Sequence, residues 1–502
     1  MNRTALPAVL RWVSATVLIL AAHGSPRGAA AEFPALCPGC NVLLISLDTL
    51  RADALGVLGS PRSATPTLDA LARRGVLFTN AYSQAPNTFP SHMSLFTGLY
   101  PWHHGVNVVK RDKLPTDIPT AAMLFKRGGY RTFWFAPMND NHLDLNVGFE
   151  KGFDRLQHHG GPGFQEAIKW LGGHPAGPFF AFLHSYRVHL PYTPKVSSVL
   201  KIEPASDPKS VFDGEAFTRS LHEEILANPA LIFSDDFIAK HPDIFASGTP
   251  RWEEFEFQMK DQKHVRTDYY NLSLMRFNQR LPPGAPGAGE RLRVLYDAVA
   301  LELDEAVAAL IGSLEDAGLT EKTVVVLTSD HGEEFLEHGR QGHNQLYSEC
   351  LHVPMIVLVP GIPERRVEQI VRNIDVLPTL LEAVGLPAPD GIDGESLVPA
   401  LRGHPLPQPR RALAFWRNSF SVRDERFTYI AAPMPGGKPP AEELYDRAAD
   451  PREERNLFPA RALEAKSWRS WLPRKSTAPP QGVWPESIDE QTRRRIMKTG
   501  YW

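Results

Sequence analysis

Two continuous apolar segments, each followed at once by an acidic residue, constrain the fold of this chain more than any other feature. Asn41–Leu47 precedes Asp48, and Val324–Ser329 precedes Asp330 and His331. Such runs are typical of parallel strands that are covered on both faces. Ligands bind outside the carboxyl ends of strands in open α/β sheets, so the three side chains are expected at one edge, as a site for a hard cation. Each aspartate alone is equally consistent with a helix N-cap or a turn.

A third segment, Pro86–Gly98, has the pattern of a loop that enters a helix ending at Gly98. Thr88 lies two residues before Pro90, and proline is favoured at the first position of a helix. A hydroxyl at a helix N-terminus meets backbone N–H groups and the positive end of the helix dipole, which favour an alkoxide and an anionic substrate. Taken alone, Thr88 would be interpreted as a simple N-cap.

In these segments the chain resembles the sulfatase family of the alkaline phosphatase superfamily. The similar stretches occur in the family's order, span roughly residues 41–192 and 290–458, and read NVLLISLDTLRADALG, TPTLDALARRGVLFTNAYSQAPNTFPSHMSLFTGLYPWHHGV, FFAFLHSYRVHLPYTP, VVVLTSDHGEEFLEHG, GHNQLYSECLHVPMIV, NIDVLPTLLEAVGLPAPDGIDGESL and ELYDRAADPREERNL. The resemblance implies an α/β fold of the alkaline-phosphatase type. Its large, mostly parallel sheet is sandwiched by helices, and a small antiparallel C-terminal subdomain follows.

The chain departs from the family where the nucleophile is expected. Formylglycine sulfatases carry Cys or Ser, any residue, Pro, any residue and Arg, whereas this chain has Thr88 at the first position and His92 at the last. Threonine does not become formylglycine, and this form resembles the unmodified threonine segment of nucleotide pyrophosphatase/phosphodiesterases. Thr49 also replaces the usual second acid after the first strand, and Asp330-His331 matches phosphonate monoester hydrolases rather than the Asp-Asn of many sulfatases. These departures predict a threonine alkoxide in place of an aldehyde hydrate.

The resemblance implies a divalent cation, either Ca, Mn or Zn, held by Asp48, Asp330 and His331 with the Thr88 hydroxyl as a further ligand. One ion per active site is expected, and a second is left open. The metal would lower the pKa of the hydroxyl and polarise the ester oxygen. Thr88 would then attack phosphorus or sulfur in line, giving a covalent intermediate that water cleaves.

Further site residues are expected from the same comparison. Catalytic roles fall on His189, which matches a family histidine near the ester, and on His343, which lies where one-metal sulfatases often have a lysine beside the leaving group. His343 would donate to the leaving oxygen, with completion of a second metal site as the alternative. Candidate substrate contacts are His92, Asn107, His184 and Arg187, and a solvated cation is an equally good interpretation of Arg187. His338 has no counterpart in this pattern and is expected at the surface or behind the site.

The N-terminal residues 1–31 read as a signal peptide. Basic residues precede the apolar stretch 12–22, and small residues at 29–31 form an Ala-x-Ala cleavage site. We therefore expect an exported protein, periplasmic or secreted, with an uncleaved anchor as the alternative. In an oxidising compartment, Cys37-Pro-Gly-Cys40 favours a short structural disulfide over a redox pair or half a zinc site, and Cys350 is expected in the core.

The same landmarks predict the organisation of the chain. We expect a catalytic domain over 32–390 with an insertion at 195–290, a small subdomain over 391–462 and an extension over 463–502. Apolar spacing predicts helices over 64–75, 119–128, 296–317, 211–227 and 252–278. The segment 411–432 reads as two strands around a polar turn, and Glu443–Asp446 is expected to pack on the main domain. The insertion either walls the active site and sets substrate choice or is simply a solvated addition.

Taken together, these features predict an exported metal-dependent hydrolase of phosphate or sulfate esters, with phosphodiesters or phosphonate monoesters favoured. An arylsulfatase-like sulfuric-ester hydrolase, a phospho-group transferase and a binding protein with a decayed site are the alternatives. The substrate would be a small-molecule or polymer ester. With 54 Lys and Arg against 57 Asp and Glu, the chain has no electrostatic signature of nucleic-acid binding. No stable membrane span is expected after signal cleavage, and the sequence leaves the oligomeric state open.

Overall fold

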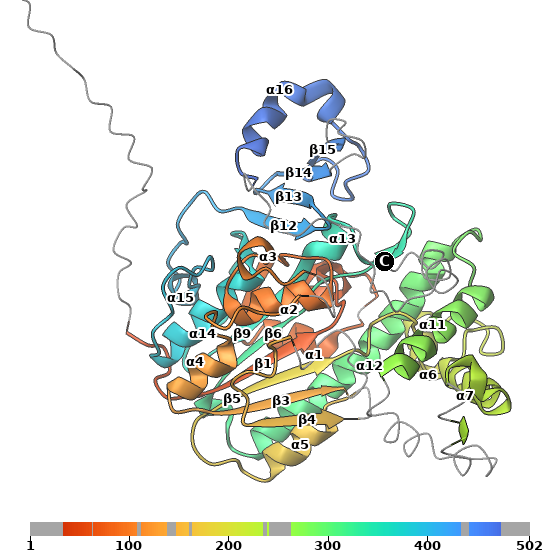
Figure 1. Cartoon of the computed structure of the whole chain (residues 1–502), viewed down its shortest axis with the longest axis horizontal. Coiled ribbons are helices and arrows are strands. Elements are labelled where there is room, and N and C mark those ends of the chain that lie inside the picture. The colour runs from red at the N-terminus through yellow and green to blue at the C-terminus, as the bar shows by residue number, and fades with distance from the viewer. Residues whose placement is uncertain are drawn as a thin grey trace, which may run out of the picture. The chain divides into compact units, whose positions relative to one another are not determined.

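A nine-stranded mixed sheet, mostly parallel, forms the centre of the computed structural model (Figure 1). The structure describes residues 34–62, 64–107, 112–137, 147–159, 163–233, 238–239, 263–432 and 441–472. The strands are β1 (Asn41–Leu47), β2 (Val76–Tyr82), β3 (Arg131–Pro137), β4 (Arg155–His159), β5 (Phe179–Ser185), β6 (Thr323–Thr328), β9 (His352–Leu358), β10 (Arg365–Val367) and β11 (Val371–Arg372). Their order is β10-β2-β9-β6-β1-β5-β3-β4, with β11 also paired to β2. Only β9 runs antiparallel to its neighbours, β2 and β6.

Strand β1 is buried on both faces, as its uninterrupted apolar sequence predicts. Leu43 and Ile45 belong to the core on one side of the sheet, and Val42 and Leu44 belong to the core on the other. Because successive side chains of a strand point to opposite faces, one short segment helps to fill both layers. Full burial of such a side chain contributes about 1.5–3 kcal/mol, so β1 is a strong anchor for the residue that follows it.

Helices cover the two faces of the sheet (Figure 1). They are α1 (Pro66–Ala72), α2 (Thr88–Thr97), α3 (Pro101–His104), α4 (Ala121–Arg127), α5 (Gln165–Gly172), α12 (Ala288–Asp316), α13 (Ser348–Leu351), α14 (Val376–Val384) and α15 (Val398–Leu401). The helices predicted over 64–75 and 119–128 correspond to α1 and α4. The third, predicted to begin at 296, starts earlier, because Leu292 and Leu295 are also buried and Gly287 adopts the left-handed conformation just before α12.

The predicted insertion contributes α6 (Val196–Ile202), α7 (Gly214–Ala227) and α11 (Lys263–Arg280), which lie together beside α12 (Figure 1). Helix α7 matches the prediction over 211–227. Helix α11 begins at 263, and residues 252–262 of that prediction lie outside the described residues. Leu221, Ile225 and Leu272 form a small separate core between α7 and α11, while Phe277 of α11 joins the main core.

A four-stranded antiparallel sheet follows, made of β12 (Ala412–Trp416), β13 (Ser419–Arg423), β14 (Phe427–Ala432) and β15 (Ala441–Asp446). The segment 411–432 therefore holds three strands rather than the predicted two. The extra turn is a two-residue hairpin at Arg417 and Asn418, whose φ angles of 47° and 71° are typical of the tight turns that join twisted strands. Tyr445 of β15 packs against Tyr82 and Leu351, which confirms the expected contact with the main domain.

The structure confirms both expectations for the cysteines and describes part of the predicted C-terminal extension. Cys37 and Cys40 form a disulfide, and Cys37 N–H donates to the carbonyl oxygen of Ala383 in α14. Cys350 is buried in the core, as predicted. Part of the predicted extension lies in α16 (Phe458–Arg469), whereas residues 473–502 and the predicted signal peptide lie outside the described residues. Within the described ranges, no helix has both the length and the apolar character needed to cross a membrane.

Candidate active site

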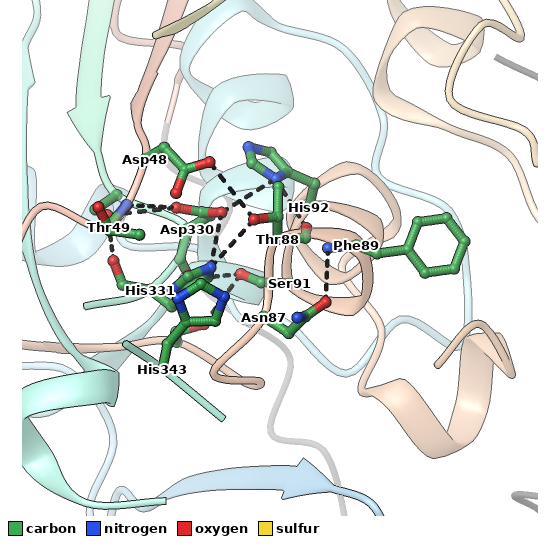
Figure 2. Close-up of polar contacts among 12 residues, drawn as sticks. Asp48, Thr49, Asn87, Thr88, Phe89, Ser91, His92, Asp330, His331 and His343 are labelled. Carbon is green, nitrogen blue, oxygen red and sulfur yellow. Dashed lines mark hydrogen bonds and ion pairs between the residues drawn. The ribbon is translucent and has the colours of Figure 1, made fainter. Parts of the chain in front are cut away.

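The carboxyl ends of β1, β5 and β6 bring the candidate metal ligands together. Parallel pairing places Ser46 of β1 opposite His184 of β5 and also opposite Thr328 of β6. Asp48 and Asp330 therefore emerge at the same edge of the sheet. Asp48, Asp330 and His331 are fully buried and each offers a ligand atom within 4.8 Å of the other two (Figure 2).

Thr88 is the first residue of α2 and lies against this group. Asn87 caps the helix, because its side-chain oxygen accepts the Phe89 N–H at 3.4 Å. Thr88 Oγ1 lies 3.5 Å from Asp48 Oδ2 and 3.2 Å from His331 Nε2, as the dashed lines in Figure 2 show. The structure thus joins the third sequence segment to the first two, with the hydroxyl at the positive end of a helix dipole.

His92 supports Thr88 from within the protein. Its Nδ1–H donates to the carbonyl oxygen of Thr88 at 2.9 Å, and its Nε2 accepts from Ser46 Oγ at 2.8 Å. Because burial lowers the pKa of His92, this neutral tautomer is the favoured one. Both ring nitrogens are bound to protein groups and the side chain is fully buried. We therefore replace the predicted substrate contact of His92 with a structural role, fixing the first turn of α2 on β1.

Thr49 has a role that its sequence position did not reveal. Its φ angle of 55° is unusual for a β-branched residue, so its backbone is strained. In this conformation the Thr49 N–H donates to Asp330 Oδ1 at 3.2 Å, and the Thr49 hydroxyl donates to the carbonyl oxygen of Val188 at 2.9 Å. The Tyr296 hydroxyl donates to the Thr49 carbonyl oxygen at 2.8 Å. The sequence showed only that Thr49 replaces an acid, whereas the structure shows that it orients one.

Three imidazoles form a row that leads away from Thr88. The ring centroids of His331 and His343 are 4.4 Å apart, and those of His343 and His189 are 5.4 Å apart. The Nδ1 atom of His331 donates to the Gly332 carbonyl oxygen at 2.9 Å, and that of His189 donates to its neighbour Leu190 at 2.7 Å. Metal binding or hydrogen bonding to a substrate at these two rings must therefore use Nε2.

Burial favours the neutral form of these imidazoles. It lowers the pKa of His331 and His343 to about 3 and that of His189 to about 4. A neutral imidazole is the form that binds metals, which suits His331. In the neutral form, His189 Nε2 can accept a hydrogen bond from a hydroxyl, and His343 Nε2 can donate one to a substrate oxygen when a protonated Glu333 donates to His343 Nδ1.

Glu333 is a site residue that the sequence reasoning missed. Its Oε1 lies 3.0 Å from His343 Nδ1, and both side chains are buried. Burial raises the pKa of Glu333 to about 7. The signal was present, since Glu333 directly follows Asp330-His331-Gly332, but nothing local indicated that the residue ten positions further on would be its partner.

The remaining candidates differ in their surroundings. His184 Nε2 lies 3.3 Å from Asp48 Oδ2, so this histidine borders the metal ligands. Arg187 forms an ion pair with Glu302 of α12, and its guanidinium also donates to the carbonyl oxygen of Thr193 at 3.0 Å. The Arg187 side chain is 13% exposed and ion-paired, so it is not a solvated cation, and its contact with a substrate stays a prediction. Asn107 is 8% exposed, and its carboxamide has no hydrogen-bond partner among the described residues.

His338 belongs to a second polar cluster, near the C-terminal sheet. Its Nδ1–H donates to Glu349 Oε1 at 2.5 Å and its Nε2–H donates to the Glu453 carbonyl oxygen at 3.1 Å. The ring stacks on Tyr347 with 3.6 Å between centroids. Although burial lowers the pKa of His338, the hydrogen bond and charge of Glu349 raise it to about 9. His338 is therefore an imidazolium that ties the loop before α13 to residue 453.

This arrangement predicts a pH dependence of stability. The pKa of His338 is about 9 in the folded state against 6.5 for an ordinary histidine, so its stabilising effect is complete below about pH 6.5 and is lost as the pH rises through about 9. We expect the melting temperature of the wild type to exceed that of His338→Gln at pH 6.5 and this difference to shrink toward pH 9. Thermal unfolding of both proteins across this range measures it. A difference that stays constant with pH would show that His338 is not charged in the folded protein.

The chain matches family models and curated proteins over most of its length. Residues 40–386 match the family model described as sulfatase, and residues 336–466 match the model described as N-sulphoglucosamine sulphohydrolase, C-terminal. The chain is 27% identical over 435 residues to an ulvan-active sulfatase of Formosa agariphila, which covers 83% of this chain and 77% of that protein. It is 25% identical over 452 residues to a Delta 4,5-hexuronate-2-O-sulfatase of Bacteroides thetaiotaomicron, covering 83% of this chain and 84% of that protein.

Solved structures show the same fold. A protein in complex with its substrate D-glucosamine-2-N,6-O-disulfate has a TM-score of 0.62 at 21% identity, covering 86% of this chain and 95% of that chain. The phosphonate monoester hydrolase of Agrobacterium radiobacter has a TM-score of 0.56 at 22% identity, with the same coverage of 86% and 95%. The structural neighbours thus include enzymes named for two kinds of ester.

Proposed function

The chain belongs to the sulfatase family of hydrolases, and we propose that within this family it cleaves phosphonate monoesters or phosphodiesters through a covalent intermediate on an unmodified Thr88. The single observation that carries the proposal is the position of Thr88 Oγ1, 3.2 Å from His331 Nε2 and 3.5 Å from Asp48 Oδ2. A weak nucleophile such as a threonine hydroxyl needs activation, and a hydroxyl beside candidate metal ligands at a helix N-terminus has two sources of it.

The donor set fits a divalent cation. Asp330 Oδ2 is fully buried and accepts no hydrogen bond from the part of the chain that the structure describes, which is costly for a carboxylate without a cation. Asp48, Asp330, His331 and Thr88 would supply two carboxylates, one imidazole and one hydroxyl. Calcium prefers six to eight oxygen ligands, whereas this set mixes an imidazole, which suits zinc, with carboxylates, which suit manganese, so we favour Mn²⁺ or Zn²⁺ over Ca²⁺. When bound, the ion lowers the pKa of the hydroxyl and polarises the ester.

Several side chains of the site have separate roles in the proposed reaction. Thr88 Oγ releases its proton to water and forms a bond to phosphorus while the bond to the leaving oxygen breaks. That oxygen takes a proton from His343 Nε2, and Glu333 replaces this proton through His343 Nδ1. His189 Nε2, next along the row of imidazoles, can accept a hydrogen bond from the hydroxyl of the released alcohol. Water later cleaves the bond to Thr88 and restores its hydroxyl. The carboxamide of Asn107, which has no hydrogen-bond partner among the described residues, is a candidate donor to a non-bridging oxygen, and His184 Nε2 lies 3.3 Å from Asp48 Oδ2.

Sulfate esters are the second candidate substrate class, because the curated relatives are named sulfatases. The phosphorus esters are favoured by the departures from formylglycine sulfatases at Thr88, His92, Thr49 and His331. We further propose that residues 1–31 direct export, so that the substrate is met outside the cytoplasm.

A panel of esters tests the proposal. Purified protein is assayed with 4-nitrophenyl esters of phosphate, methylphosphonate and sulfate and with a bis-4-nitrophenyl phosphodiester, each with Mn²⁺, Zn²⁺ or Ca²⁺. We expect the phosphonate or the phosphodiester to have the highest kcat/KM, with Mn²⁺ or Zn²⁺. A clear preference for the sulfate would favour the second candidate, and protein that neither binds metal nor turns over any ester would be a decayed member of the family.

A further inference from the structure

The surroundings of Thr88 become more exposed beyond His189. The side chains of His331 and His343 are 0% and 1% exposed, and His189 is 8% exposed. Beyond His189 the next side chains in ring contact are Tyr186 and Tyr270, and both are only half-buried. A substrate attacked at Thr88 must extend its leaving group toward solvent, and this row marks such a direction.

The two tyrosine rings lie on His189 at similar distances. The Tyr186 centroid is 5.6 Å from that of His189 at an interplanar angle of 65°, and the Tyr270 centroid is 5.9 Å away at 67°. Tyr186 is fixed by a turn, because the His189 N–H donates to the Tyr186 carbonyl oxygen at 3.0 Å. Its ring also contacts that of His184 at 4.7 Å. A rigid turn therefore presents one of the two rings.

The insertion presents the other ring, and its helix is braced on two sides. Tyr269, the neighbour of Tyr270 on α11, has its hydroxyl 3.1 Å from His222 Nε2 on α7. Phe277, two turns further along α11, packs against Tyr192 in the main core with 6.2 Å between centroids. Helix α11 thus contacts both the small core of the insertion and the main domain, and Phe277, its contact with the main domain, is the one that sets the position of Tyr270 beside His189.

We propose that Tyr186 and Tyr270 form a binding surface for the leaving group and that this surface selects esters whose leaving group carries a ring. This inference rests on the proposed function. The matching chemistry is a flat, weakly polar face, since such a face packs on the face of a tyrosine ring. An aromatic alcohol and the C–H face of a pyranose both have it, whereas a short alkyl alcohol does not.

The test compares a large and a small leaving group of similar reactivity. KM and kcat are measured for the phenyl and the trifluoroethyl ester of whichever acid the wild type prefers, with a pyranosyl ester as a third arm. The proteins are the wild type, Tyr270→Ala, Tyr270→Phe and Tyr269→Ala, the last being a control for disturbance of α11. Binding of phenylphosphonate and of methylphosphonate is measured by calorimetry as a readout that needs no turnover.

We expect Tyr270→Ala to raise KM for a ring-bearing ester by about tenfold and for the trifluoroethyl ester by less than about twofold, with little change in kcat. Tyr270→Phe should restore the wild-type KM, and Tyr269→Ala should leave the ratio of the two KM values unchanged. A larger effect on the phenyl or on the pyranosyl arm identifies which ring is preferred.

Equal effects of Tyr270→Ala on the large and small esters, or no effect on either, would overturn the proposal. If the wild type cleaves none of the esters, the proposed function fails instead. The inference then depends on the calorimetry, where phenylphosphonate must bind more tightly than methylphosphonate to the wild type but not to Tyr270→Ala.

Discussion

Replacing Thr88 with alanine is expected to lower kcat by about 10⁴-fold or more on every ester that the wild type cleaves. Alanine removes the only atom that forms the covalent bond, while Asp48, Asp330 and His331 keep their positions at the ends of β1 and β6. Metal content, measured by mass spectrometry of the purified protein, should therefore stay at the wild-type level. The comparison is made on steady-state rates with saturating metal.

Thr88→Ser is the matched control. A serine hydroxyl at the same helix terminus retains the nucleophile, so this variant should stay within about tenfold of the wild type. Thr88→Ala with activity near that of Thr88→Ser would mean that another group, such as a metal-bound water, attacks the ester.

Replacing Asp330 with asparagine is expected to have the second largest effect, through loss of the metal. An amide carries no charge and offers one oxygen, and Asp330 Oδ2 is the buried atom that otherwise accepts no hydrogen bond from the described chain. We expect metal content to fall to about a tenth of the wild-type level or less and kcat/KM to fall by at least ~10³-fold. Elemental analysis after dialysis, followed by assays with added Mn²⁺ or Zn²⁺, measures both.

Asp304→Asn is the matched control, because it makes the same substitution at another buried aspartate. Asp304 accepts hydrogen bonds from the backbone N–H groups of Thr67 and Leu68, both at 2.8 Å, at the start of α1, and it does not belong to the ligand cluster of Asp48, Asp330 and His331. This variant should lower the melting temperature while keeping metal content. Asp330→Asn that retained a full complement of metal would remove Asp330 from the ligand set.

The fold and the centre of the site were predictable because their signals are local. Asn41–Leu47 and residues 324–329 are mostly apolar, which is typical of a strand buried on both faces. The register of β1 with β6 then brings Asp48 and Asp330 together without any further information. The α2 segment carries its own start signals, namely the cap at Asn87 and the proline within its first turn.

The roles of other residues were not predictable because their partners lie far away in sequence. Arg187 has its ion pair with Glu302, which belongs to a different helix, so the segment around Arg187 gave no sign that its charge was neutralised. The strained backbone of Thr49 is held by contacts with Asp330 and Val188, and no sequence pattern encodes it. His92 similarly needed the position of Ser46 to reveal that it supports α2.

Covalent capture on Thr88 tests the central claim most directly. The wild type is mixed with its best ester, quenched in acid within the first turnover and digested, and the peptide that contains residue 88 is analysed by mass spectrometry. The account predicts an unmodified threonine before the reaction and one phosphoryl, phosphonyl or sulfuryl group on Thr88 after it, with no such adduct in Thr88→Ala. An enzyme that turns over the ester while Thr88 never carries the group would contradict it.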